Sequence, residues 1–253
     1  MLNTKLYLSG YTSDLLRGTD EPRPWDLTKV ILTKTNTQTR LLDIGCGDAR
    51  KLIPLASQMC HISAMEPSNV MRSLAANKIN TAKINNISLI AGRAKQLPFN
   101  DHSFDVVTCI LSTWDSQEIY RVLKPGGWFI NETFGCEDKL EFKKAFGKDR
   151  EGNWRGQLIS VNNNTCMHRY KRDLLQQHFG EIAITNGFWN TYYTQQGLLE
   201  LCEFTPTISG FDRDKDRDHF NDVTQKLMTE KGIKIKQNRL LIIAKKPQSV
   251  FHD

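Results

Sequence analysis

One short segment of the sequence combines an acid with closely spaced glycines, a pattern suited to binding a small molecule. It reads Leu41-Leu-Asp-Ile-Gly-Cys-Gly-Asp-Ala-Arg50, with Asp43 in a hydrophobic run and Gly45 and Gly47 directly after it. Where a ligand lies against the backbone of a turn, only a residue without a bulky side chain leaves room for it. We therefore expect a ligand-binding turn between a strand and a helix.

The residue at position 50 narrows the kind of ligand. The phosphate-binding fingerprint G-x-G-x-x-G would require glycine there, and this chain has Arg50. A dinucleotide site is therefore disfavoured. S-adenosylmethionine carries no phosphate, and its ammonium and sulfonium centres favour a nearby acid such as Asp43.

Four further segments follow this turn in an order that is typical of one enzyme family. They are Met65-Glu-Pro-Ser68, Ala91-Gly-Arg-Ala-Lys-Gln-Leu-Pro-Phe99, Phe104-Asp-Val-Val-Thr108 and Arg121-Val-Leu-Lys-Pro-Gly-Gly127. Residues 40 to about 134 resemble the class I S-adenosylmethionine-dependent methyltransferases, a broad group that includes the ubiquinone/menaquinone C-methyltransferases. Ala49 replaces the third glycine of that family's first motif, and alanine would favour a helix beginning there.

The resemblance implies roles for individual residues. Asp43 would hold the methionine amino group, directly or through water, and Glu66, 19 residues after Gly47, would bind the ribose diol. Met71 would offer its thioether to the adenine, unless it is an ordinary core residue of its helix. Arg93 stands where the family commonly has an acid, which leaves the backbone amide of Ala94 to bind adenine. The implied cofactor-binding residues are Asp43, Gly45, Cys46, Gly47, Glu66, Pro67, Met71, Arg93, Ala94, Cys109 and Ile110, and S-adenosylhomocysteine would be the product.

Catalytic and substrate-binding residues are less marked. Methyl transfer mainly requires a nucleophile held in line with the sulfur–methyl bond, so a general base is optional. Candidates for a base are Tyr11, Asp115 and Glu132, although helix caps and exposed acids are the ordinary explanation of such acids. Candidates for contact with the acceptor are the aromatic residues Tyr7, Tyr11, Trp25 and Trp114. In many relatives the N-terminal segment folds over the cofactor, while the alternative for these aromatics is packing of an N-terminal arm on the sheet.

The elements that must position these residues follow from hydrophobic periodicity. Short apolar runs alternate with amphipathic stretches, which predicts βαβ units around a parallel sheet. We expect strands at 41–44, 61–65, 87–91, 104–110, 128–133, 182–193 and 238–245, and a tight turn at 124–127. We expect helices at 49–59, 69–79, 117–123, 169–178, 195–203 and 219–231. The predicted fold is α/β, a Rossmann-like doubly wound sheet in three α/β/α layers, mostly parallel with an antiparallel C-terminal strand.

We interpret residues 1–253 as a single methyltransferase domain, because no Ser/Pro/Gly-rich linker separates two parts. Residues 1–39 would form an N-terminal lid or arm and residues 40–134 the cofactor-binding core. Residues 135–235 would form a substrate cap with the sixth strand, and residues 236–247 the last strand.

Composition excludes several classes of protein. A hydrophobic fraction of 39% and a charged fraction of 25% are typical of a globular chain and not of disordered or fibrous ones. The longest apolar runs fall far short of the roughly 18 residues that span a bilayer, and residues 1–10 do not resemble a leader. Six widely spaced cysteines predict reduced thiols and no metal site. We expect a cytoplasmic protein with no membrane span.

Three functions remain in competition. The first is methyl transfer to a small or medium-sized molecule. The second is methylation of RNA, suggested by the basic segment 226–246 with seven Lys and Arg residues against one acid. The third is a non-catalytic S-adenosylmethionine-binding protein. The sequence does not identify the acceptor atom or the oligomeric state.

Overall fold

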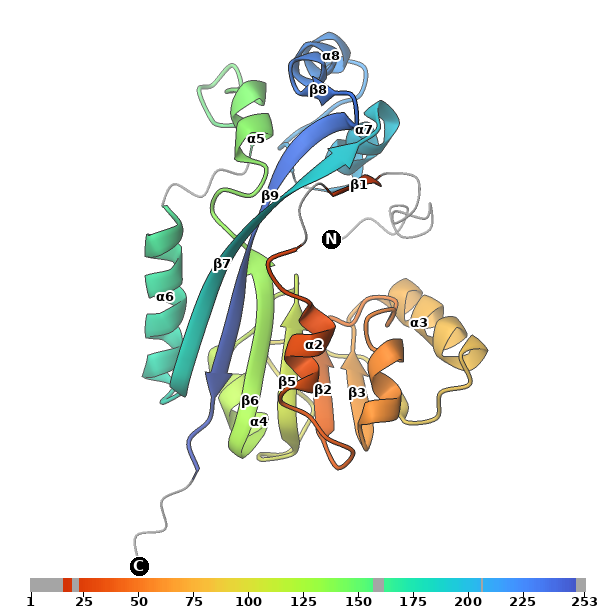
Figure 1. The fold of residues 1–253 in the computed structure, drawn as a ribbon, viewed down its shortest axis with the longest axis vertical. Helices are drawn as coiled ribbons and strands as arrows, with labels where there is room; N and C mark the ends of the chain where they lie inside the picture. Colours follow the sequence, from red (N-terminus) through yellow and green to blue (C-terminus); the bar gives the residue numbers. More distant parts are fainter. Residues whose placement is uncertain (1–15, 20–22, 157–161, 206, 249–253) are drawn as a thin grey trace, which may run out of the picture. The chain divides into compact units, whose positions relative to one another are not determined.

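The structure is a computed structural model that describes residues 16–19, 23–156, 162–205 and 207–248 (Figure 1). Tyr7 and Tyr11 lie outside the described residues. The chain divides into two compact units. Unit 1 comprises Met1–Pro24, Gly135–Cys166 and Gly187–Arg239, and unit 2 comprises Trp25–Phe134, Met167–Asn186 and Leu240–Asp253. The division into lid, core, cap and last strand that the sequence suggests stays a prediction.

Unit 2 is built on a mostly parallel sheet. Its strands β6, β5, β2, β3 and β4 are neighbours in that order and pair in parallel. They span β2 (Arg40–Ile44), β3 (His61–Met65), β4 (Ile87–Ile90), β5 (Phe104–Ile110) and β6 (Leu123–Phe134). Parts of β9 (Gly232–Lys245) and β7 (Gly180–Tyr193) extend the sheet beyond β6, and β9 runs opposite to β6 (Figure 1). The predicted sheet with its antiparallel C-terminal strand is confirmed.

Helices cover both faces of this sheet because neighbouring strand residues point to opposite sides. Leu41 and Val106 pack in one core cluster, whereas Leu42 and Val107 pack in the other. The first cluster lies under α2 (Leu27–Leu32), the 3₁₀ helix η1 (Ile53–Gln58) and α3 (Asn69–Thr81). The second lies under α4 (Ser116–Val122) and α6 (Asn163–Gln176). The three predicted layers are therefore present.

Unit 1 has a core of its own. Phe142, Leu198, Leu201 and Phe220 are buried together with other apolar side chains of this unit. They come from α5 (Leu140–Phe146), α7 (Gln195–Phe204) and α8 (Arg217–Lys226). The short strands β1 (Leu16–Thr19) and β8 (Met228–Thr229) pair antiparallel with β7 and β9.

The structure corrects the predicted helix at 49–59. Only η1 forms there, and Ala49 has φ 60°, a left-handed conformation that an α-helix excludes. Pro54 also has no N–H to donate within a helix. Ala49 therefore does not begin a helix, and it holds the left-handed conformation that glycine adopts most easily.

Other boundaries also differ from prediction, and α6, for example, begins at Asn163 and not at residue 169. The expected turn at 124–127 lies inside β6, where it forms an irregularity between the pairs Phe104–Leu123 and Val106–Trp128. The helix expected to reach 231 ends at Lys226, because the chain turns into β8 and then into a longer β9.

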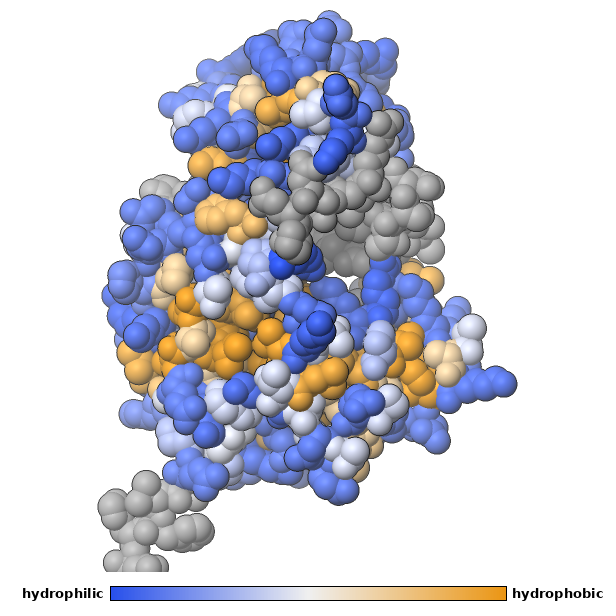
Figure 2. Space-filling model, viewed as in Figure 1, coloured by the Kyte–Doolittle hydropathy of each residue, from blue (hydrophilic) through white to orange (hydrophobic). Residues whose placement is uncertain are grey.

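Hydrophobic residues on one face of unit 2 gather over β6, β7 and β9, beside α2 (Figure 2). Also in unit 2, the ammonium groups of Lys34 and Lys245 lie 3.8 and 5.0 Å from the ring centroid of Trp128. Within the described residues, none of the helices combines the length and the apolar character needed to cross a bilayer.

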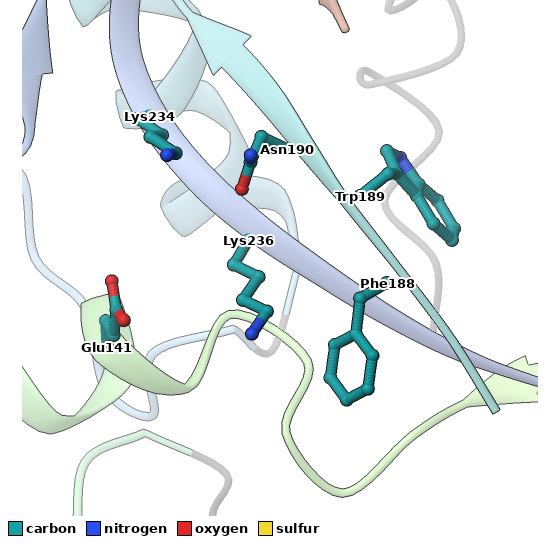
Figure 3. A pocket seen from close by; sticks show the side chains of 6 residues that line it. All are labelled: Glu141, Phe188, Trp189, Asn190, Lys234 and Lys236. Atoms are coloured by element: carbon teal, nitrogen blue, oxygen red, sulfur yellow. The ribbon is translucent and has the colours of Figure 1, made fainter. Parts of the chain in front are cut away.

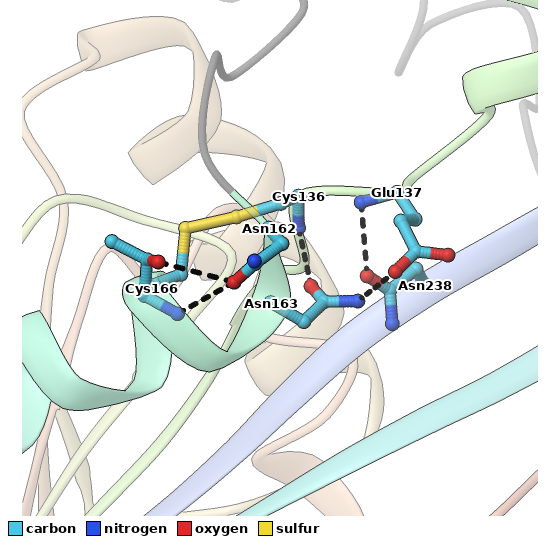
Figure 4. Close-up of a disulfide and its surroundings, with 7 residues drawn as sticks. Cys136, Glu137, Asn162, Asn163, Cys166 and Asn238 are labelled. Carbon is cyan, nitrogen blue, oxygen red and sulfur yellow. Dashed lines mark hydrogen bonds between the residues drawn. A yellow bond between two sulfur atoms is a disulfide. The ribbon is translucent and has the colours of Figure 1, made fainter.

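The prediction of six reduced cysteines is wrong for two of them. Cys136 and Cys166 form a disulfide, and Cys46, Cys60, Cys109 and Cys202 are free (Figure 4). Asn163 lies beside the disulfide, where its Oδ1 accepts a hydrogen bond from the Cys136 amide at 2.8 Å and its Nδ2 donates to Glu137 at 2.7 Å. The two cysteines are 30 residues apart, so their spacing in the sequence gave no sign of the contact.

The disulfide makes stability depend on oxidation. We expect the oxidised protein to be about 3 kcal/mol more stable than a Cys136→Ser variant, because the link restricts the unfolded chain. Urea unfolding measures the difference, and it should largely disappear when both proteins are reduced with dithiothreitol. Equal stability of the oxidised protein and the variant would contradict the assignment.

Candidate functional site

Two buried acids lie at the carboxyl ends of neighbouring parallel strands. Asp43 in β2 is 5% exposed, and Glu66 directly follows β3 and is 9% exposed. The pKa of Asp43 is raised to about 6, because burial, together with the nearby charge of Glu66, outweighs the opposing hydrogen bond from Thr108 and the charge of Lys51. The structure thus brings together the two acids that the sequence singles out.

Thr108 fixes the carboxylate of Asp43. Its Oγ1 donates to Asp43 Oδ1 at 2.5 Å, because the parallel register of β2 and β5 places the two residues side by side. No role for Thr108 was predicted from the sequence. What could have indicated a role is its position in the run Phe104–Thr108, near the end of the strand that pairs with the strand of Asp43.

Glu66 joins the two turns that follow β2 and β3. Its Oε2 accepts from the Gly47 amide at 3.1 Å and its Oε1 accepts from the Ser68 amide at 2.9 Å. The amides of Gly45 and Cys46 both donate to Met65 O, at 2.8 and 3.0 Å. An ionised carboxylate has about four acceptor positions, so Glu66 keeps capacity for the hydroxyl groups of a ligand.

The two glycines differ in what surrounds them. Gly45 has φ 80°, and a Cβ added there would meet Ser112 Oγ at 2.2 Å. Gly47 has φ 57°, and its added Cβ would meet only the Met71 methyl, at 3.7 Å. Gly45 therefore allows the chain after β5 to approach, whereas Gly47 leaves open space beside Glu66 and Met71.

The remaining predicted cofactor residues differ in how far they are buried. Cys46 and Cys109 are thiols whose pKa burial raises, so they stay neutral at ordinary pH. Met71 is buried, which agrees with the ordinary core interpretation as well as with a place beside Gly47. The other four are exposed or half-buried, namely Pro67, Arg93, Ala94 and Ile110. Their contact with a cofactor stays a prediction.

Two predicted catalytic acids have structural partners. Asp115 caps α4, where its Oδ1 accepts from the amides of Gln117 and Glu118 at 3.1 and 3.0 Å. Glu132 is 1% exposed, and its Oε2 accepts from Trp25 Nε1 at 2.8 Å. Trp25 itself packs in the first core cluster. The sequence thus selected two residues that do touch each other, and their roles in catalysis and substrate binding stay predictions.

A cavity of about 540 Å³ lies in unit 2, and we call it the Trp114 cavity. Its lining residues come from the segment after β5, from β6 and from α6: Ser112, Thr113, Trp114, Thr133, Arg169, Tyr170, Arg172, Asp173 and Gln176. Of these the sequence analysis named only Trp114 as a substrate residue. The four residues Arg169, Tyr170, Arg172 and Asp173 were missed because nothing in the sequence indicates which side of the later helix faces this segment.

A second cavity, of about 460 Å³, lies in unit 1 (Figure 3). It is lined by Glu141, Phe188, Trp189, Asn190, Lys234 and Lys236. The Lys236 ammonium lies 4.5 Å from the Phe188 ring centroid. Across the described part of the chain, no three His, Cys, Asp or Glu side chains gather in a way that could hold a metal ion.

Comparison with known proteins finds a family that matches the part of the chain containing Asp43 and Glu66. Residues 42–131 match the family described as a methyltransferase domain. This segment is therefore similar to methyltransferase domains. The demethylmenaquinone methyltransferase of Listeria welshimeri is 34% identical over 113 residues, which are 41% of this chain and 48% of that protein. The chain therefore spans about half the length of the curated relatives that it matches.

Solved structures show the same fold over most of the chain. The YcgJ protein of Bacillus subtilis has a TM-score of 0.60 at 18% identity, covering 88% of this chain and 98% of that one. Phosphoethanolamine N-methyltransferase 2 of Haemonchus contortus, solved in complex with S-adenosyl-L-methionine, has a TM-score of 0.54 at 20% identity. That comparison covers 88% of this chain and 53% of the Haemonchus chain.

The contact between Gly45 and Ser112 is testable by mutation. Gly45→Ala should destabilise the protein by more than the roughly 1 to 2 kcal/mol that a left-handed conformation costs an alanine, because the new methyl also overlaps Ser112. Gly152→Ala is the matched control, since Gly152 has φ 85° and open space around it.

Urea unfolding compares the two variants. Adding Ser112→Gly to Gly45→Ala should recover the excess loss, leaving the cost of the backbone conformation alone. Equal destabilisation by Gly45→Ala and Gly152→Ala would show that Ser112 does not press against this turn.

Proposed function

We propose that this protein is an S-adenosylmethionine-dependent methyltransferase that acts on a small or medium-sized molecule. The observation that carries the proposal is the pair of buried acids, Asp43 and Glu66, at adjacent strand ends within a segment that matches a methyltransferase domain. Ligands of open α/β sheets bind outside the carboxyl ends of the strands, where both acids lie.

The residues at this turn fit the cofactor. A buried acid whose pKa is raised gains from a cationic partner, and Asp43 would meet the ammonium group of the cofactor's methionine part. Glu66 would accept hydrogen bonds from the ribose hydroxyls, and the open space at Gly47 would let the ligand lie against the backbone. When bound, S-adenosylmethionine supplies an electrophilic methyl carbon.

The chain's own contribution would be to hold the partners in place. Thr108 keeps the Asp43 carboxylate in one orientation, and Glu66 holds the two turns together through the amides of Gly47 and Ser68. Positioning of this kind is the main requirement of methyl transfer, because the methyl donor is already reactive. Where an acceptor must lose a proton, Glu132 would be a candidate base, and the hydrogen bond from Trp25 Nε1 to its Oε2 would orient its carboxylate.

A small-molecule acceptor is supported by the relatives, which are named demethylmenaquinone methyltransferases. The RNA alternative loses part of its support in the structure of segment 226–246. Lys246 is buried and donates to Tyr120 O and Leu123 O at 2.6 and 2.8 Å, and Arg239 is buried against Asp138. Two of the seven basic residues are thus turned into the protein, whereas Lys226, Lys231, Lys234 and Lys236 are exposed.

The sequence also suggests a cytoplasmic location, and we retain that as a proposal. Four free cysteines support a reducing environment, whereas the disulfide between Cys136 and Cys166 is typical of an oxidising one. Counting the free thiols of protein alkylated during lysis tests the location, because six free thiols would indicate a reducing compartment and four would indicate one in which the disulfide persists.

The roles of the two acids predict separate losses of affinity. Asp43→Asn and Glu66→Gln should each weaken S-adenosylhomocysteine binding by about 1 to 3 kcal/mol, because each removes a charged hydrogen-bond partner. Calorimetric titration measures the affinity, and thermal unfolding verifies that each variant is folded. Asp222→Asn is the control, since Asp222 is an exposed acid on α8. Unchanged affinity in both site variants would contradict the proposal.

The raised pKa of Asp43 predicts a pH dependence of binding. Below pH 6 the free protein carries Asp43 protonated, and binding a cation then requires loss of that proton. Affinity for S-adenosylhomocysteine should therefore be constant above about pH 7 and fall about tenfold per pH unit below 6. Calorimetry in two buffers of different ionisation heat should detect the release of about three quarters of a proton at pH 5.5 and of none at pH 8. Asp43→Asn should abolish the pH dependence of the affinity. An affinity that stays constant from pH 8 to 5 in the unmodified protein would refute the role of Asp43 in binding the amino group.

A further inference from the structure

We propose that the Trp114 cavity binds the methyl acceptor and that the acceptor is a planar aromatic molecule with an anionic substituent. This inference rests on the proposed methyltransferase function and adds the place and the chemical class of the second substrate. Three independent features of the cavity support it: its position on the sheet, its aromatic surfaces and its charge.

The cavity lies at the ends of the two strands next to the acid site. Ser112, Thr113 and Trp114 directly follow β5, and Thr133 lies near the end of the adjacent β6. β5 also pairs with β2, the strand that carries Asp43. Ser112 is shared by both places, because it lines the cavity and also approaches Gly45. A molecule in the cavity would therefore be separated from the Gly45 turn only by the thickness of this segment.

Two aromatic rings form a rigid wall of the cavity. The Trp114 and Tyr170 rings have centroids 5.9 Å apart and planes inclined by 31°. Trp114 also packs at 5.1 Å against Phe129, which is fully buried. Because Trp114 packs against a buried ring and is half-buried, its ring has a fixed position in the cavity wall, and a flat aromatic ligand can stack on such a surface.

The charged residues of the cavity favour an anion. Arg169 and Arg172 from α6 are exposed, and Asp173 is the acid among the lining residues. The Arg169 guanidinium lies 5.5 Å from the Tyr170 ring centroid. Within the part of the chain that the structure describes, Arg172 has no carboxylate partner. A guanidinium group binds a carboxylate or similar anion through two parallel hydrogen bonds, so an anionic substituent would satisfy it.

The size and the remaining polar groups agree with a small molecule. A volume of about 540 Å³ falls within the range that binds small ligands. The hydroxyl groups of Ser112, Thr113 and Thr133 come from the strand ends, whereas the guanidinium groups come from α6. Such an arrangement can orient a ring that has an oxygen substituent at one end and an acid at the other.

The test uses 2-naphthoate as the probe and the full chain, titrated by calorimetry with and without saturating S-adenosylhomocysteine. We expect 2-naphthoate to bind at least tenfold more tightly than 2-naphthamide, which lacks the charge, and than cyclohexanecarboxylate, which lacks the aromatic ring. Arg172→Gln and Trp114→Leu should each weaken 2-naphthoate binding at least fivefold. Lys171→Gln is the matched control, because Lys171 is an exposed cation on the same helix and does not line the cavity.

The outcomes separate this inference from the proposed function. Normal binding of S-adenosylhomocysteine together with no binding of 2-naphthoate would overturn the cavity assignment and leave the methyltransferase proposal intact. The cavity assignment would also be overturned if Arg172→Gln and Lys171→Gln weakened the binding of 2-naphthoate equally. Because Trp114→Leu removes packing against Phe129, Arg172→Gln at an exposed position is the deciding variant if Trp114→Leu fails to fold. If S-adenosylhomocysteine does not bind at all, the proposed function fails whatever 2-naphthoate does.

Discussion

The buried carboxylate of Asp43 is the constraint on which the site depends. Taking this group out of water raises its pKa to about 6, and the shift from the ordinary value corresponds to about 3 kcal/mol against the charged form. This net cost already includes the opposing hydrogen bond from Thr108 and charge of Lys51, and the repulsion from Glu66. A cationic ligand would offset it, so the burial that disfavours the charged form of Asp43 in the free protein provides a driving force for binding.

Much of the fold was predictable from alternation in the hydrophobic runs. Leu41 and Leu42 pack on opposite faces of one sheet, as do Val106 and Val107, so helices must cover both faces. Ala49 shows where this reasoning ends. Its helix propensity favoured an α-helix, but the turn around Gly45 and Gly47 imposes a left-handed conformation on it, and a constraint of that kind depends on the surrounding structure.

The candidate site also combines residues that the sequence predicts with residues that it does not. Asp43, Glu66 and the two glycines were predictable because they lie close to one another in sequence or at the ends of consecutive strands. Thr108 and Ser112 act across strand pairs, and Arg172 reaches the cavity from a helix 58 residues after Trp114. Contacts between residues so far apart in the sequence follow from packing, and the same is true of the disulfide between Cys136 and Cys166. Local sequence patterns contain no signal for them.

The most direct measurement is a crystal structure of the protein with S-adenosylhomocysteine. The account predicts that the amino group of the ligand contacts the Asp43 carboxylate, that the ribose hydroxyls contact Glu66, and that the ligand backbone passes over Gly47. A ligand bound elsewhere, or one in this place whose amino group and ribose contact neither acid, would contradict it.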